Sequence, residues 1–130
     1  MSVFSDQKEF MEACGQTTGQ YNKNQLELYR KLIQEEFEEL QDGIKNQDRV
    51  EILDALMDII VVTVGAAHSL GVDVEGAWQE VVDNNNSKVD KETGKVRKRE
   101  DGKILKPEGW KPPNFEQYVY KQINFVDSEK

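Results

Sequence analysis

Apolar residues recur at a spacing of three or four positions in two long stretches of the chain, and this spacing is typical of amphipathic helices. The first predicted helix covers about residues 22–44 and begins at an Asn cap, Asn22 or Asn24. The second covers about residues 48–71 and begins at Asp48. The connection between them is short and rich in helix breakers, so we predict that the two helices are antiparallel neighbours.

Weaker helical patterns flank this pair. A short helix is predicted from Ser5 or Asp6 to about Cys14, with Gly15 as its stop. Its expected buried side consists of Phe4, Phe10, Met11 and Cys14. A fourth helix, capped by Asp73, is predicted to run to residues 84–87. The four helices together predict an all-α fold, an antiparallel helical bundle.

The chain changes character at residues 88–114, which hold nine of its 17 lysines and arginines. Two turn signals, Thr93-Gly94 and Asp101-Gly102, predict a basic hairpin or an ordered loop, and three prolines exclude a long helix. A short terminal helix is predicted within residues 115–125. We therefore expect a single domain over residues 1–130, with a helical core at about 4–87 and a short extended tail.

Composition narrows the possible functions. The net charge of −8 argues against a surface for a nucleic acid polymer, although the basic tail reverses the sign locally. A single cysteine, Cys14, fits a reducing compartment. The N-terminal residues carry no signal-peptide pattern, and the longest apolar run, residues 59–64, is too short to span a bilayer. These features predict a cytoplasmic protein that does not enter membranes.

Carboxylates at unexpected positions are the most specific feature of the sequence. When the first long helix is drawn on a wheel at about 100° per residue, Glu36 and Glu39 fall inside its apolar arc. On the second, Glu51, Asp54 and Asp58 form one stripe on a helix that is otherwise apolar nearly all round. The short connection brings these two sets of acids towards each other.

A bound cation would explain these positions. Burying an unpaired carboxylate costs on the order of several kcal/mol. No lysine or arginine is interleaved with the acids to offset this cost. Oxygen ligands without His or Cys favour Mg²⁺ or Mn²⁺. The alternative is a solvated acidic face, which we expect for Glu38. His68 does not follow an acid at the spacing of a di-iron site, so we interpret it as a packing or interface residue.

The second long helix also predicts assembly. One chain of this size cannot cover a helix that is apolar on nearly every side, so a homodimer or homotetramer built on this helix is expected.

The residues Glu35-Glu36-x-x-Glu39 followed by Glu51-x-x-Asp54 resemble the paired-helix signature of the all-α nucleoside triphosphate pyrophosphatases, which include MazG-like proteins and dimeric dUTPases. The chain is further similar to the phosphoribosyl-ATP pyrophosphohydrolase branch. This second resemblance rests on residues 10–16, on Asp54-x-x-x-Asp58-Ile59-Ile60, on Asn85-x-Ser87-Lys88 and on residues 99–103. Val61 stands in place of an expected tyrosine, and Val82-Asp83 in place of an expected His-Arg pair, which bears on the substrate more than on the chemistry.

The resemblance implies a metal-dependent hydrolase that cleaves nucleotides between the α and β phosphates, with roles in the nucleotide pool. The acids named above would hold Mg²⁺ or Mn²⁺, with Asp58 as an outer partner, and Glu35 or Glu36 would activate water. The expected substrate-binding residues are Gln16, Asn85, Lys88, Arg99 and Lys103, with Lys106 adding charge. The alternatives are a phosphoribosyl-ATP pyrophosphohydrolase of histidine biosynthesis and a non-catalytic metal-binding bundle.

For the individual substrate-binding residues a simpler role remains open. Asn85 is equally suited to ending the fourth helix in a left-handed turn, a loop glutamine such as Gln16 faces solvent by default, and any single tail lysine is as well explained as a solvated side chain. Trp78 and Trp110 are interpreted as packing residues.

Overall fold

The computed structural model describes residues 1–119, which form five helices and no strand. The helices are α1 (Val3–Ala13), α2 (Lys23–Lys45), α3 (Arg49–His68), α4 (Val74–Asn86) and α5 (Glu116–Val119). The predicted all-α fold is therefore confirmed. The chain divides into two compact units, residues 1–74 and the segment that begins at Glu75, which are described separately below.

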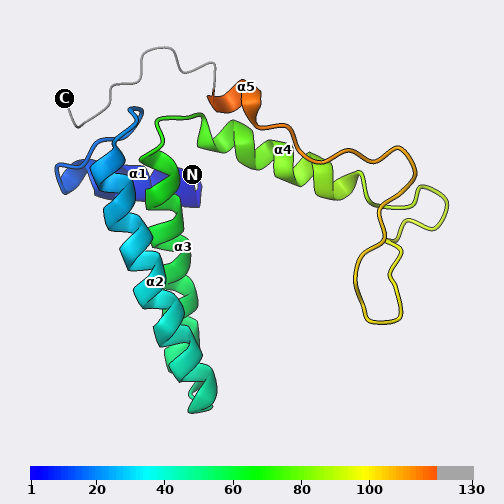
Figure 1. Ribbon diagram of the computed structural model, residues 1–130, viewed down its shortest axis with the longest axis horizontal. Coiled ribbons are helices and arrows are strands. Elements are labelled where there is room, and N and C mark those ends of the chain that lie inside the picture. Colours follow the sequence, from blue (N-terminus) through cyan, green and yellow to red (C-terminus); the bar gives the residue numbers. More distant parts are fainter. Residues whose placement is uncertain (120–130) are drawn as a thin grey trace. The chain divides into compact units, whose positions relative to one another are not determined.

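The first unit is built on the antiparallel hairpin of α2 and α3, shown in cyan and green in Figure 1. The caps are those that the sequence predicts. The Asn22 side chain accepts from the backbone N–H of Gln25, and the Asp48 side chain accepts from the N–H groups of Val50 and Glu51. The two helices approach closely at the turn, where a Cβ on Gly43 would lie 3.2 Å from the Ile52 side chain.

Helix α1 packs against the end of this hairpin that lies opposite the turn (Figure 1). The small core there contains Met11 of α1, Tyr29 of α2 and Val62 of α3. His68 is buried, and its Nε2 lies 2.8 Å from the carbonyl oxygen of Phe4, so the packing role predicted for this histidine is confirmed.

The prediction for α1 was wrong in two respects. The helix starts at Val3, because Ser2 and Ser5 form a reciprocal capping box ahead of the expected caps. Its buried side was predicted only in part, since Met11 is buried as expected but so is Gln7, whereas Phe10 is 60% exposed and Cys14 is exposed. An earlier start does not change which residues share a face of the helix. The buried side is instead determined by which side of α1 contacts the α2–α3 hairpin.

A polar network holds the loop between α1 and α2 against the end of α3. The buried Gln25 side chain donates to the Thr17 carbonyl oxygen and to Ser69 Oγ, at 2.8 and 2.9 Å. The Asn22 backbone N–H donates to the Ser69 carbonyl oxygen at 2.8 Å. This loop is therefore an ordered part of the first unit.

The second unit contains most of α4, the basic tail and α5. Both predicted turns are present, and each is closed by one antiparallel bridge, Val89 with Val96 and Lys98 with Ile104. Neither bridge extends into a strand, so the tail is an ordered loop. Helix α5 is confirmed at Glu116–Val119, and the rest of the predicted terminal helix lies outside the described residues. Among residues 1–119 no helix has the length and apolar character needed to cross a membrane.

Candidate active site

The acids predicted to bind metal lie on the two facing helices of the hairpin. Glu36 and Glu39 are on the C-terminal half of α2, and Glu51, Asp54 and Asp58 are on the N-terminal half of α3. Because the helices are antiparallel and joined by a short turn, these halves lie side by side (Figure 1). The structure thus brings together the part of each helix that carries the acids.

Glu36 has the most unusual environment of the group. Its pKa is raised from 4.5 to about 7, first by burial of the carboxyl group and then by a side-chain hydrogen bond with Glu39 and the negative charges of Glu39, Asp58 and Asp54. Its Oε2 atom is shielded from solvent and has no hydrogen-bond partner. A carboxyl group with these neighbours stabilises its neutral form, or requires a positive charge beside it.

A cavity of about 240 Å³ lies beside this group and is lined by Glu39, Asp42, Glu51, Asp54 and Ala55. Four of the five lining residues are acids, and three of these were predicted from the sequence. Asp42 was missed as a site residue because the sequence around Gly43 was interpreted only as part of the breaker-rich connection between the two long helices. Its position three residues after Glu39 on the same helix was the signal that could have identified it.

The donor set fits a hard divalent cation in its chemistry. None of the five predicted acids forms an ion pair with a lysine or arginine of residues 1–119, and oxygen ligands of this kind suit Mg²⁺ or Mn²⁺. Within the same residues, no three Asp, Glu, His or Cys side chains are grouped tightly enough to form a metal site. Holding an ion would therefore require rotamer changes at the exposed Glu39, Glu51 and Asp54 side chains.

Two neighbouring glutamates on α2 are exposed. Glu38 accepts a hydrogen bond from Gln34 at 3.2 Å, which matches the solvated role predicted for it. Glu35, the candidate for activating water, is exposed next to Glu36 in the sequence. It is not among the groups that perturb the pKa of Glu36.

Gln16 lies in the ordered loop of the first unit and is partly buried. Its Oε1 accepts a 2.5 Å hydrogen bond from the Tyr29 hydroxyl group, and Gln7 contributes a second side-chain hydrogen bond to that hydroxyl. Burial is the main cause that raises the pKa of Tyr29. The side-chain oxygen of Gln16 thus already accepts a hydrogen bond, and the side-chain N–H groups are the part of this amide that could donate to a ligand.

The other predicted substrate-binding residues belong to the second unit. Asn85 lies within α4 and accepts from Lys88 Nζ at 3.2 Å. Asn85 does not form the left-handed turn considered for it: in the described part of the chain, Gln47 is the only non-glycine residue with a positive φ. Arg99 pairs with Asp101 at 2.6 Å, and the Asp101 side chain also accepts from the Lys103 backbone N–H. The Arg99 side chain and the Lys103 backbone therefore hold the second turn together.

Comparison with known families decides the class of this arrangement. The family model for phosphoribosyl-ATP pyrophosphohydrolase matches residues 7–85, which is more than half of the chain. The chain belongs to the phosphoribosyl-ATP pyrophosphohydrolase family. This family is part of the MazG-like superfamily of nucleoside triphosphate pyrophosphatases. No curated protein matches the sequence in a direct search.

Family membership identifies the protein as a pyrophosphohydrolase, an enzyme that hydrolyses phosphoric anhydrides. The matched residues of the phosphoribosyl-ATP pyrophosphohydrolase family include all the acids of the hairpin, together with Gln16 and Asn85. Lys88, Arg99 and Lys103 lie beyond the match. The basic tail is thus the part of the chain about which the family comparison says nothing.

Proposed function

We propose that the protein is a metal-dependent nucleotide pyrophosphohydrolase that cleaves between the α and β phosphates and releases a nucleoside monophosphate and pyrophosphate. The observation that carries this proposal is the environment of Glu36, whose Oε2 atom is shielded and has no hydrogen-bond partner, and whose pKa is raised by burial and by Glu39, Asp58 and Asp54. Membership of a family of anhydride hydrolases gives this acidic group a purpose, because Mg²⁺ in proteins is commonly bound by one or two carboxylates together with the phosphates of a substrate.

The residues proposed to hold Mg²⁺ or Mn²⁺ are Glu36, Glu39, Glu51 and Asp54, with Asp58 as an outer partner. When bound, the ion supplies charge neutralisation at the phosphates and lowers the pKa of a coordinated water. The α2–α3 hairpin holds the acids on two rigid helices, which fixes the position of the anhydride relative to them.

Glu35 and Glu36 are the proposed catalytic carboxylates. One of them accepts a proton from water as the water oxygen forms a bond to the α phosphorus and the bond from that phosphorus to the bridging oxygen breaks. The electron pair of the broken bond leaves with pyrophosphate. Glu35 is the candidate for proton transfer because it is exposed and directly precedes Glu36 in the sequence. Gln16, Asn85 and Lys88 are proposed to contact the nucleotide.

The two candidate substrate classes are canonical nucleoside triphosphates and phosphoribosyl-ATP. The family name favours phosphoribosyl-ATP, and with it a role in histidine biosynthesis. Val61 and Val82-Asp83, which replace residues expected for that branch, favour the broader nucleotide substrate. Both substrates contain the same α–β anhydride, so the proposed chemistry is the same.

The proposal is tested with a panel of nucleotides that contains both classes, assayed with Mg²⁺ or Mn²⁺ for pyrophosphate and for orthophosphate. We expect pyrophosphate as the product. The Glu39→Gln variant should lower kcat by about 10- to 100-fold at millimolar metal, since a ligand of the ion is lost. It should also abolish the rise in melting temperature that Mg²⁺ causes in the wild type, a rise that follows from binding to the folded state alone.

The matched control is Glu38→Gln, which makes the same chemical change one position away on the exposed face of α2. This variant should keep both the activity and the stabilisation by Mg²⁺. Release of orthophosphate alone would contradict cleavage between the α and β phosphates. No product from any nucleotide, by a folded protein that is stabilised by metal, would contradict the hydrolase proposal and favour the non-catalytic metal-binding bundle.

A further inference from the structure

Two ammonium groups lie close to the indole ring of Trp110 in the basic tail. Lys106 Nζ is 4.4 Å from the ring centroid, and Lys88 Nζ is 5.4 Å from it. The two nitrogen atoms are therefore separated by no more than about 10 Å, which is the screening length of salt at about 0.1 M. Their charges act on the same small region, where an anion would offset the repulsion between them.

The indole N–H of Trp110 provides a second, independent observation. The Nε1 atom is shielded from solvent and has no hydrogen-bond acceptor. An indole N–H can only donate, and a buried donor without an acceptor is destabilising. A ligand with oxygen acceptors would satisfy this group.

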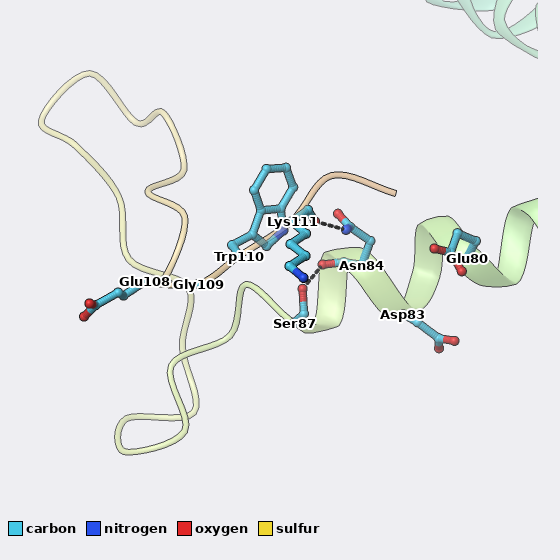
Figure 2. A pocket seen from close by; sticks show the side chains of 8 residues that line it. All are labelled: Glu80, Asp83, Asn84, Ser87, Glu108, Gly109, Trp110 and Lys111. Atoms are coloured by element: carbon cyan, nitrogen blue, oxygen red, sulfur yellow. Dashed lines mark hydrogen bonds between the residues drawn. The ribbon is translucent and has the colours of Figure 1, made fainter. Parts of the chain in front are cut away.

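A cavity of about 420 Å³ adjoins Trp110 and also involves Asn84, Ser87 and Lys111 (Figure 2). Asn84 donates to the Lys111 carbonyl oxygen at 2.7 Å, which attaches this part of the tail to the end of α4. The exposed Lys111 side chain is the one ammonium group among the residues that line this cavity, whereas Lys88 and Lys106 lie against the Trp110 ring.

Three carboxylates also line this cavity, and their directions matter for an anionic ligand. The Glu80 carboxylate accepts from the Asn114 backbone N–H at 3.2 Å, and Asp83 accepts from the Gln79 side chain at 2.9 Å. Figure 2 shows the Asp83 and Glu108 side chains directed away from the Trp110 indole. The groups that approach Trp110 are thus positively charged.

We propose that Lys88, Lys106 and the indole N–H of Trp110 form a binding site for an oligophosphate chain. The inference rests on the proposed function in that such a chain is part of the substrate. It extends the expected set of phosphate-binding residues, because Lys106 and Trp110 join Lys88. All three residues lie beyond the region matched by the family model.

The site is tested by the binding of inorganic triphosphate to the full-length protein at an ionic strength of about 0.15 M. The chain contains two tryptophans, so in the Trp78→Phe protein the emission reports on Trp110 alone. We expect a saturable change in this emission. Lys106→Ala should weaken binding by about tenfold or more, as expected when one charge-assisted contact is lost.

Trp110→Phe, measured by calorimetry, keeps an aromatic ring for the lysines and removes only the N–H donor, and it should weaken binding by at least about threefold. The matched control is Lys98→Ala, which removes one exposed lysine from the same tail and should leave binding within about twofold of wild type. Thermal melts show which variants are folded, and Lys106→Ala still tests the site if Trp110→Phe is not.

Absence of saturable triphosphate binding by the folded wild type would overturn the site. Equal weakening by Lys98→Ala and Lys106→Ala would also overturn it, since this pattern indicates a diffuse attraction to the whole tail. Binding of inorganic triphosphate is measured in EDTA, where a metal-dependent hydrolase does not turn over, so the result is independent of the proposed function. Tight binding by a protein that hydrolyses no nucleotide would refute the hydrolase and leave the oligophosphate site standing.

Discussion

Glu36 is a residue whose chemistry depends on neighbours from two helices. Phe37 and Glu38, which follow it on α2, are exposed, whereas Glu36 is partly buried and adjacent to three other acids. The hydrogen bond between Glu36 and Glu39 requires a proton on one of the two carboxyl groups, because an ionised carboxylate can only accept. In the absence of metal this proton is held up to near neutral pH.

Replacing Glu36 by Gln should therefore change stability in a pH-dependent manner without metal. The folded-state pKa of about 7 lies above the ordinary value of 4.5, so the stabilising protonated form is present at low pH and lost as the pH rises to 7. In EDTA, Glu36→Gln should melt several degrees above wild type at pH 8, for a difference on the order of 1 kcal/mol. At pH 5 the two proteins should melt at nearly the same temperature.

The measurement is a pair of thermal melts for each protein, with Glu38→Gln as the control for the loss of one negative charge. A constant difference between Glu36→Gln and wild type from pH 5 to pH 8 would show that the Glu36 carboxyl group does not titrate between these values.

At the scale of elements, the contact between α2 and α3 depends on a glycine. Gly65 is buried on α3 and faces the ring of Tyr29 on α2, so closely that a Cβ at this position would lie 2.3 Å from Tyr29 Cε1. No side chain other than hydrogen fits there. The same Tyr29 donates to Gln16, so this helix contact also holds the loop that carries a proposed nucleotide-binding residue.

Gly65→Ala should accordingly destabilise the first unit, although alanine is the better helix former. Displacement of a buried aromatic ring by an added methyl group costs about 1–3 kcal/mol, which is a fall of roughly 4–20 °C in melting temperature for a unit of this size. Thr63→Ala, at an exposed position on the same helix, is the control and should change the melting temperature little. A Gly65→Ala protein at least as stable as wild type would mean that the Tyr29 ring moves aside at no cost.

At the scale of the whole molecule, the α2–α3 hairpin has an apolar surface that a single chain does not cover. Many large apolar side chains of α2 and α3 are more than 40% exposed, and Val50 reaches 79%. The group comprises Leu28, Phe37, Ile44, Val50, Leu53, Leu56, Met57, Ile60 and Val61. Exposed apolar side chains along two adjacent helices mark a surface for association, and a second copy of this chain remains the predicted partner.

Light scattering at micromolar concentration should therefore report a mass of at least twice the 15.0 kDa of the chain. Leu53→Glu places a charge on this surface at a residue that is 58% exposed in the single chain, and it should shift the protein towards monomer. Lys31→Glu, at an exposed polar position of α2, is the control. A wild-type protein that remains a stable monomer would contradict the prediction of a homodimer or homotetramer.

Local signals in the sequence determined the positions of the helices and the identity of the acids. Caps at Asn22 and Asp48, breakers at the turn and the apolar period are read within one or two turns of helix, so the α2–α3 hairpin followed from them. The helical wheel predicted inward positions for Glu36 and Glu39; Glu36 is partly buried as predicted, whereas Glu39 is exposed, so its predicted position was wrong. The reciprocal capping box at Ser2 was equally local, and it was overlooked in favour of the caps that follow it.

Tertiary structure decided what each of these side chains meets. The apolar period does not encode which side of α1 is buried. It also does not encode the packing of Tyr29 on Gly65, the hydrogen bond from Tyr29 to Gln16 or the ion pair between Arg99 and Asp101. The same holds for Trp110, interpreted from the sequence as a packing residue, since its lysine neighbours come from positions 22 and 4 residues away through an irregular loop. Periodicity predicts a face for a residue in a helix, whereas in a loop only the folded path brings distant charges together.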